Sequence, residues 1–475
     1  MPGQARRLYG TDAQRTPAAR ATSVALLAAS LSGSRGAMTI AKDDAGADAY
    51  APGRRGAKAR RWPIVLPMRA LLYVAHGALV LCNRVARALR LVPRALLLIP
   101  PAAPGSLGDE AMVVATVGAM RTRFAGRIGI VRYRRTTDFP VQVDSTFDLS
   151  RYFEQGGARG EELRLLWTLL GYSNVALLGA DVLDGFYSDD AVRLRLRLVA
   201  VAARAGAQTS VLGFSCNERP TPRAEALIRA LPASVRLFAR DALSQARLSA
   251  IAASAVERAA DTAFLLQPDK ANPQVQALAH WAAGVHRSKG RVLGVNLSAV
   301  AMEEAGLSPD AALAVAHEAL ERLLAARPAT RLVLVPHDMR GGDSDVDMLR
   351  RLALRLAAIQ PDMRMLELPL PASAIKAACA SMDLVWTGRM HLAIAAIGQG
   401  TPAVAHEYQG KFAGLFTDTK LEALLFPRDR LPTGAAIADL LIESLDRCEA
   451  LHDSIMERLP ALTALAQRNI DANAP

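Results

Sequence analysis

Arg389 and His391 lie in the segment Thr387-Gly388-Arg389-Met390-His391, between an apolar run and an apolar helical stretch. We therefore expect a guanidinium and an imidazole where a parallel strand passes into a helix N-terminus, whose free N–H groups favour anions. Lys411 follows the next predicted strand and would add another positive charge. This pattern predicts a pocket for a small, doubly anionic ligand with a proton donor beside it. The alternative is that the pair only caps carbonyl groups or binds a carboxylate of the fold.

Two acidic segments follow predicted strands nearer the N-terminus. The first is Gly105-Ser106-Leu107-Gly108-Asp109-Glu110, whose glycines allow a tight strand-to-helix turn. Asp109 and Glu110 could face sugar hydroxyls, or they could complement the helix N-terminus. The second segment, Leu178 to Ser188, contains Asp181 together with aromatic residues, a combination that suits sugar binding.

Arg240 and Asp241 occupy a further strand-to-helix corner, with Ser244 three residues later. On its own this pair could be a surface ion pair, which contributes little to stability. His337 ends another predicted strand, where a lone histidine is more often structural, so we leave it out of the predicted site.

Taken together, these segments resemble the polysaccharide pyruvyl transferase family. The closing signature is carried by residues 388–391, by Gly400-Thr401-Pro402 and by Tyr408 to Leu415. The run 105–110 resembles the family's G-x-x-G-D-E segment, and 240–244 resembles its Arg-Asp-x-x-Ser. Two further matches keep the expected order along the chain. Gly179-Ala180-Asp181, where the family usually has Gly-Gly-Asp, lies between these two segments, and Asp261-Thr262-Ala263-Phe264 lies after them.

The resemblance spans roughly residues 95–425 and implies transfer of the pyruvyl group of phosphoenolpyruvate to a sugar as a cyclic ketal. It implies that Arg240, Arg389 and Lys411 hold the carboxylate and phosphate. We expect His391 to be the general acid, with Arg389 as the second catalytic residue. The acceptor, a sugar or lipid-linked oligosaccharide, is expected at three carboxylates: Asp109, Glu110 and Asp181.

Charge and cysteine content exclude several other classes of protein. The net charge of +12 belongs to residues 1–104, which hold 16 Lys/Arg and 4 Asp/Glu; the remainder holds 41 of each sign. The body therefore offers no basic stripe for nucleic acid. The four cysteines are far apart, which predicts no zinc site or disulfide framework and favours a reducing, cytoplasmic location. We expect no metal and no cofactor, with phosphoenolpyruvate as co-substrate.

Apolar runs alternate with helical patterns twice along the chain, which predicts an α/β protein with two Rossmann-like, doubly wound domains facing a cleft. The resemblance implies the same arrangement, like that of two-domain GT-B glycosyltransferases. The expected divisions are an N-terminal domain on the acceptor side, a C-terminal domain on the phosphoenolpyruvate side and a helical tail: 94–270, 290–430 and 434–470.

The N-terminal 93 residues lie outside the resemblance. We expect residues 1–60 to be a basic, disordered extension. Residues 61–93 are predicted to form a basic amphipathic helix, which either lies on an anionic membrane at its inner face or packs on the body as a leader helix.

Two other functions fit parts of the sequence. One is a nucleotide-sugar glycosyltransferase on the same fold, which would bind a uridine or guanosine nucleotide. The other is a non-catalytic, membrane-associated partner of polysaccharide assembly.

Overall fold

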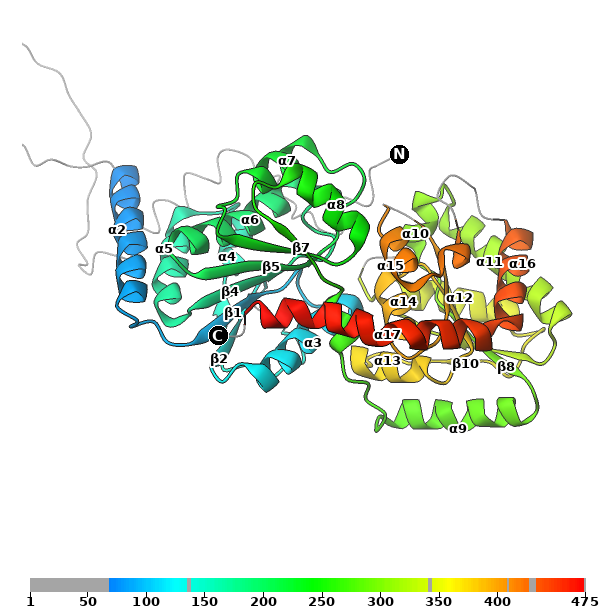
Figure 1. The fold of residues 1–475 in the computed structure, drawn as a ribbon. Coiled ribbons are helices and arrows are strands. Elements are labelled where there is room, and N and C mark those ends of the chain that lie inside the picture. The colour runs from blue at the N-terminus through cyan, green and yellow to red at the C-terminus, as the bar shows by residue number, and fades with distance from the viewer. Residues whose placement is uncertain (1–67, 135–137, 341–343, 408–409, 427–432, 474–475) are drawn as a thin grey trace, which may run out of the picture. The chain divides into compact units, whose positions relative to one another are not determined.

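The computed structural model describes residues 68–134, 138–340, 344–407, 410–426 and 433–473. The predicted disordered extension, residues 61–67 and Tyr408 lie outside these ranges. The described chain contains two parallel β-sheets with helices around them, one in an N-terminal lobe and one in a C-terminal lobe (Figure 1).

The N-terminal lobe is built on a seven-stranded sheet of order β3-β2-β1-β4-β5-β6-β7, in which all neighbours are parallel. Strand β1 has the sequence ALLLI and is buried throughout, as expected of a strand covered on both faces. The strands are β1 (Ala95–Ile99), β2 (Arg127–Arg132), β3 (Ser145–Asp148), β4 (Asn174–Leu178), β5 (Gln208–Phe214), β6 (Val235–Ala239) and β7 (Val256–Arg258).

The C-terminal lobe repeats this winding in a six-stranded parallel sheet of order β10-β9-β8-β11-β12-β13. Each sheet starts in its middle, and the direction of winding reverses between β1 and β4 and between β8 and β11. Ligands of such sheets bind beside these reversal points, at the carboxyl ends of the strands. The strands are β8 (Arg291–Val295), β9 (Thr330–Leu334), β10 (Arg364–Met365), β11 (Leu384–Thr387), β12 (Ala403–His406) and β13 (Leu425–Phe426).

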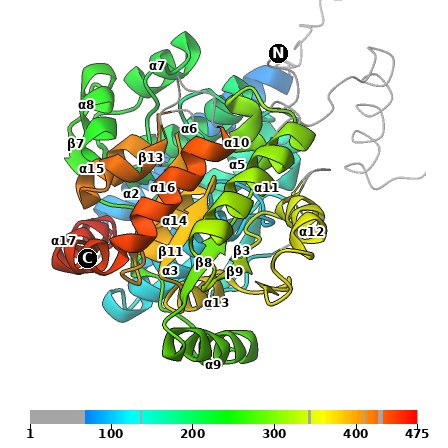
Figure 2. The same ribbon diagram turned by 90° about the vertical axis from the view of Figure 1, so that its right-hand side faces the viewer.

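Most crossover helices begin at a side chain that accepts a backbone N–H, such as Ser106, Ser188 and Ser308. In the N-terminal lobe the helices are α2 (Met68–Ala88), α3 (Leu107–Arg123), α4 (Ser150–Glu154), α5 (Arg159–Thr168), α6 (Asp189–Arg204), α7 (Pro222–Arg229), α8 (Ala242–Ile251) and the 3₁₀ helix η3 (Thr262–Leu265). In the C-terminal lobe they are α9 (Pro273–Arg287), α10 (Ala299–Glu304), α11 (Pro309–Ala326), α12 (Asp345–Leu356), α13 (Ala372–Cys379), α14 (Met390–Ile397), α15 (Phe412–Thr419) and α16 (Gly434–Asp446). Figure 2 shows α11 and α16 side by side on this lobe.

The two lobes share packing and hydrogen bonds. One continuous apolar core includes Leu96 of the first sheet and Val292 of the second. The backbone N–H of Leu107 donates to His337 O at 3.2 Å, and that of Met339 donates to Gly105 O at 3.3 Å. The last helix, α17 (Cys448–Asp471), runs from the C-terminal lobe back to the N-terminal lobe (Figure 1).

Several predicted elements differ from those observed. The stretch 267–290, where we placed the division between the two units, contains the unpredicted helix α9. The predicted strand 364–368 is shortened to two residues. The single helical tail predicted from Gly434 is two helices, α16 and α17, separated at Arg447. Among the described residues, no helix is both long enough and apolar enough to cross a membrane.

Candidate active site

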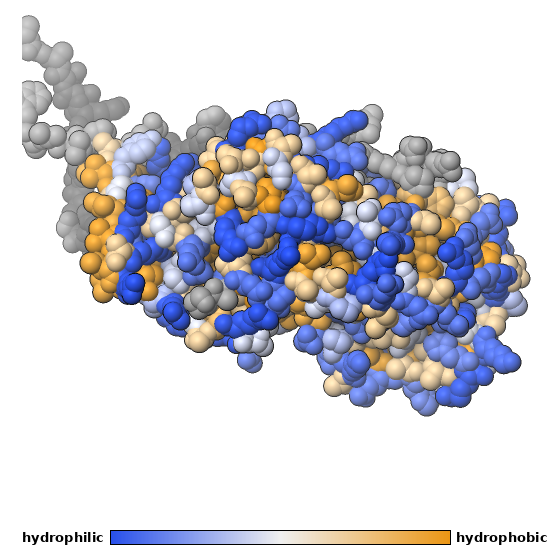
Figure 3. Space-filling view, in the orientation of Figure 1, coloured by the Kyte–Doolittle hydropathy of each residue, from blue (hydrophilic) through white to orange (hydrophobic). Residues whose placement is uncertain are grey.

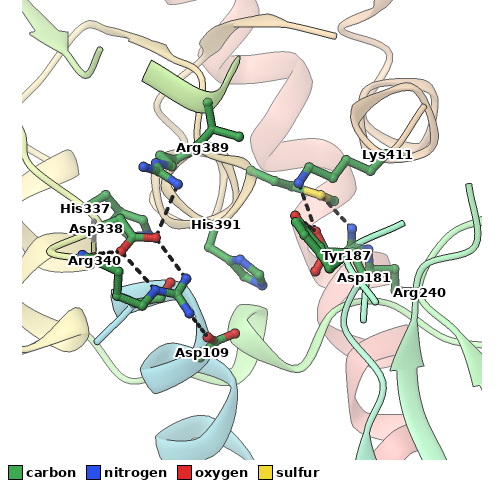
Figure 4. A pocket seen from close by; sticks show the side chains of 13 residues that line it. Asp109, Asp181, Tyr187, Arg240, His337, Asp338, Arg340, Arg389, His391 and Lys411 are labelled. Atoms are coloured by element: carbon green, nitrogen blue, oxygen red, sulfur yellow. Dashed lines mark hydrogen bonds and ion pairs between the residues drawn. The ribbon is translucent and has the colours of Figure 1, made fainter. Parts of the chain in front are cut away.

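A pocket lies between the lobes, beside the points where the winding of each sheet reverses. The N-terminal lobe contributes residues of the loops and first helical turns that follow β1, β4 and β6. The C-terminal lobe contributes those that follow β8, β9, β11 and β12. Its lining is predominantly polar (Figure 4): Ser106, Asp109, Asp181, Tyr187, Arg240, Val300, His337, Asp338, Arg340, Arg389, Met390, His391 and Lys411.

Arg240 and His391 come from different lobes and meet at one carboxylate. Arg240 Nη1 lies 3.3 Å from Asp261 Oδ2, and His391 Nε2 lies 3.5 Å from the same oxygen. Burial opposes ionisation of Asp261, but His391 and then Arg240 hold the pKa of its carboxyl below its usual value. Asp261 is therefore an anion that positions both a cation and an imidazole at the pocket.

Gly108 provides the space that the imidazole occupies. It lies in the first turn of α3, and a Cβ built on it would be 2.5 Å from His391 Nδ1. Ser106 caps this turn by accepting the Gly108 N–H at 3.2 Å. Gly108 therefore permits close approach of the His391 side chain from the other lobe.

Arg389 is held by two carboxylates of its own lobe. Its Nη2 donates to Asp345 Oδ1 at 2.7 Å, and its Nη1 donates to Asp338 Oδ2 at 3.2 Å. Asp345 is fully buried and also accepts from Asn296 Nδ2 at 2.7 Å. Asp345 was not singled out by the sequence analysis, and its place at the start of α12 is the ordinary place for a helix-capping acid.

Lys411 and Asp181, one from each lobe, form an ion pair of 2.9 Å across the pocket. The Tyr187 hydroxyl also donates to Asp181 Oδ2, at 3.2 Å. Burial opposes ionisation of Asp181, but Lys411 and then Arg240 hold the pKa of its carboxyl well below the usual range. Lys411, predicted to bind phosphoenolpyruvate, and Asp181, predicted to bind the acceptor, thus contact each other directly.

Arg340 forms a second pair across the pocket that the sequence analysis missed. Its Nη1 donates to Asp109 Oδ2 at 3.3 Å, and its Nη2 donates to Asp338 Oδ2 at 2.9 Å. Burial raises the pKa of Asp109, although Arg340 and His391 act in the opposite direction. Figure 4 shows the His391 ring between the two groups of ion pairs, one around Arg340 and one around Lys411.

His337 lies in the pocket wall with 3% of its surface exposed, and neither ring nitrogen has a hydrogen-bond partner. Burial lowers its pKa to about 3, and His391 and Arg389 act in the same direction. The ring is therefore neutral at neutral pH and offers polar atoms to a ligand.

Glu110 is the one predicted site residue that the structure does not bring to the pocket. Its Oε1 accepts the backbone N–H of Ala372 at 2.8 Å, at the start of α13. Glu110 therefore caps a helix of the other lobe. Among the described residues, no group of three or more His, Cys, Asp or Glu side chains is arranged to hold a metal ion.

A family profile described as Polysaccharide pyruvyl transferase matches residues 107–410, the greater part of the chain. The chain belongs to this family. The resemblance recognised in the sequence is thus confirmed, and the matched range contains every predicted site residue from Asp109 to His391. No curated protein matches the chain.

Solved structures with the same fold include sugar-nucleotide enzymes. A putative UDP-N-acetylglucosamine 2-epimerase from Listeria monocytogenes is 15% identical with a TM-score of 0.53, over 80% of this chain and 95% of that one. A UDP-GlcNAc 2-epimerase from Neisseria meningitidis bound to UDP-GlcNAc is 10% identical with a TM-score of 0.53, over 80% and 98%. At such identities the likeness shows only the fold, which is the predicted GT-B-like arrangement of two Rossmann-like units.

In this chain the signature residues divide into two groups. Arg389, His391 and Lys411 line the pocket. Other signature residues support the fold: Thr401 donates to Cys379 O at 2.8 Å, and a Cβ on Gly414 would lie 2.3 Å from Asp241 Cγ. Asp241 itself caps α8 by accepting the Ser244 N–H at 2.6 Å.

Proposed function

We propose that this polysaccharide pyruvyl transferase moves the pyruvyl group of phosphoenolpyruvate onto two hydroxyls of one sugar, forming a cyclic ketal and releasing inorganic phosphate. The observation that carries the proposal is the meeting of Arg240 and His391 at Asp261, in a pocket that also holds Arg389 and Lys411. These three cationic side chains and one imidazole thus line a polar pocket between the lobes.

Phosphoenolpyruvate brings a carboxylate and a phosphate that must be held apart. Arginine suits planar, bidentate capture of such groups. Arg389 contacts Asp338, and Lys411 contacts Asp181. Asp338 and Asp181 therefore hold the two cations in position. The carboxylate and phosphate of phosphoenolpyruvate would bind these cations beside the Asp338 and Asp181 carboxylates or in their place.

His391 would protonate the methylene carbon of phosphoenolpyruvate as the general acid. The central carbon then carries positive charge and is attacked by one sugar hydroxyl. Phosphate leaves that carbon, and a second hydroxyl closes the ketal. One hydroxyl proton restores His391, and the other leaves with phosphate, so the step balances without oxidant, reductant or metal.

The acceptor sugar would lie on the side of the N-terminal lobe. Asp109 and Asp181 both follow central strands of that sheet and line the pocket, and Tyr187 provides an aromatic surface beside them. A sugar of a lipid-linked oligosaccharide fits this proposal as well as a free one. Phosphoenolpyruvate is a cytoplasmic metabolite, so we place the reaction in the cytoplasm, with no cofactor.

Replacing His391 tests the proposal directly. In His391→Ala, phosphate release from phosphoenolpyruvate with a glycan acceptor should fall by about a hundredfold or more, the scale for loss of a general acid. His286→Ala is the matched control, because His286 is a half-exposed residue of α9 outside the pocket. Full turnover by His391→Ala would refute the assigned role.

A ligand comparison separates the two rival functions. Phosphoenolpyruvate should raise the melting temperature of the wild type, because a ligand that binds only the folded state stabilises it. Stabilisation by a uridine or guanosine nucleotide but not by phosphoenolpyruvate would instead indicate a nucleotide-sugar glycosyltransferase. If replacing Arg240, His391 and Lys411 together left polysaccharide assembly unchanged, the chain would be a non-catalytic partner.

A further inference from the structure

Helix α2 packs on the N-terminal lobe through polar side chains and through Leu79 and Val80. Asn83 is fully buried, and its Nδ2 donates to Leu166 O at 2.8 Å. Arg87 Nη2 donates to Leu169 O at 2.9 Å and to Tyr172 O at 2.7 Å. These carbonyls lie at the end of α5 and just beyond it, where helices leave carbonyl groups without intrahelical partners.

The opposite face of α2 is apolar and exposed. Val74, Ala78, Leu81 and Val85 follow one another at four, three and four residues, which places them on one side of a helix. Val74 and Leu81 are 64% and 63% exposed, and Val85 is 48% exposed. Leu89 and Leu91 continue the apolar surface beyond the helix end. We call these six residues the α2 stripe.

The α2 stripe differs from the other exposed apolar residues of the described chain. Leu354, Ile359 and Met456, for example, are exposed on other elements, and isolated exposures of this kind are normal. Figure 3 shows a continuous band of apolar atoms over α2 at one edge of the molecule. The face that carries Asn83 and Arg87 docks on the lobe, so the apolar face opposite it is available to another surface.

Charge near the stripe indicates which surface fits. From residue 68 to residue 108 the sequence has five arginines and no Asp or Glu. Arg84, Arg90 and Arg94 are exposed around the stripe. Arginine can keep its guanidinium among anionic headgroups while its methylene groups follow an apolar surface. No described helix is apolar enough to cross a membrane, so α2 would lie along it.

We propose that the α2 stripe docks this protein on an anionic lipid bilayer, with Val74, Leu81 and Val85 in the headgroup boundary and the arginines beside them. The proposal rests on the geometry of α2 and is independent of the proposed reaction. The two roles expected from the sequence, a packed leader helix and a membrane-surface helix, are then compatible. One face of α2 contacts the lobe, and the opposite face contacts the bilayer.

Vesicle co-sedimentation of the full chain, without substrate, tests this proposal. The wild type should bind vesicles of phosphatidylcholine and phosphatidylglycerol in equal parts, and bind phosphatidylcholine alone far less. The double variant Leu81→Glu/Val85→Glu should lose about tenfold or more of that binding, because two carboxylates then face the bilayer. Both residues are exposed, so the fold should tolerate the change.

The matched control is Leu354→Glu/Ile359→Glu, which adds the same charge at exposed apolar residues of the C-terminal lobe. It should bind like the wild type. Equal binding by the stripe variant and the wild type would overturn the proposal, as would a wild type that binds neither kind of vesicle. A wild-type dimer that Leu81→Glu/Val85→Glu dissociates, without vesicle binding, would show that a second copy covers the stripe and would also overturn it.

Discussion

At the scale of single residues, the site depends on one glycine as much as on the charged side chains. A Cβ at position 108 would lie 2.5 Å from His391 Nδ1, far inside normal contact. His391 cannot move freely to relieve the clash, because its other ring nitrogen, Nε2, is paired with Asp261. Gly108 and His391 therefore act as a pair across the two lobes.

Gly108→Ala should reduce turnover by about tenfold or more, because a displaced general acid loses the geometry that proton transfer requires. Gly118→Ala is the matched control: it lies in the same helix, and a Cβ there meets nothing within 4 Å. The control should keep full activity and gain up to about 1 kcal/mol of stability, the usual difference between glycine and alanine in a helix. Phosphate-release assays and urea unfolding measure both effects. Equal activity of the two variants would contradict this account.

The sequence was sufficient to identify the residues that come directly after strands. Arg240, Arg389, His391 and Lys411 all line one pocket, although they are distant along the chain. Arg340 could not be identified in the same way. It matters because its side chain reaches Asp109 of the other lobe, and a single sequence does not record which loops of two lobes meet.

At the scale of elements, Glu110 caps the N-terminus of a helix. Helix α13 has Pro371 at its N-cap, which provides no side-chain acceptor, and Glu110 accepts the Ala372 N–H from the opposite lobe. The sequence offers a capping role for Glu110 as an alternative, but at the start of its own helix. The observed cap joins α3 to α13.

Glu110→Ala should destabilise the protein by about 1 kcal/mol, the typical cost of losing a cap, and leave the KM for the acceptor unchanged. Glu110→Gln keeps an acceptor oxygen and should recover part of the stability. Urea unfolding and acceptor titration check the two expectations. A raised acceptor KM with unchanged stability would restore the acceptor-binding role that the sequence suggested.

Element prediction worked best where an apolar strand or helix was long. Helix α9 was missed although Asn272 and Pro273 are a usual helix start, because the stretch was taken as the division between units. Strands β3, β7 and β13 have two to four residues and carry too little pattern to be recognised. The prediction of a helical tail from Gly434 holds, but nothing in the sequence indicated the division into α16 and α17 at Arg447.

At the scale of the whole molecule, α17 ties the C-terminal end of the chain to the N-terminal lobe. Asn469 is fully buried; its Oδ1 accepts the Gly213 N–H at 3.0 Å, and its Nδ2 donates to Ala260 O at 2.8 Å. The end of α17 is therefore bonded to β5, a strand of the N-terminal sheet.

Asn469→Ala should lower the free energy of unfolding by about 2–4 kcal/mol, because a buried N–H and a buried carbonyl each lose a partner. Thr463→Ala is the control, since Thr463 is exposed on the same helix and bonds only to Leu459 O there. Denaturant unfolding compares the two variants with the wild type. A loss no larger than that of the control would show that α17 does not secure the lobes through this residue.

The doubled α/β winding was predictable because each apolar run and helical pattern recurs in order along the chain. The arrangement of the two lobes relative to each other was not predictable, since it depends on contacts such as those of α3 with α13 and α14.

The backbone bonds Leu107 N to His337 O and Met339 N to Gly105 O form a seam directly beside the pocket. A seam of main-chain bonds resists sliding and leaves rotation about its own line as the easiest movement. Any widening of the mouth would then hinge there, on the side of Asp109. Glycan and products would pass over the far rim, where Lys411 and Asp181 pair across the two lobes.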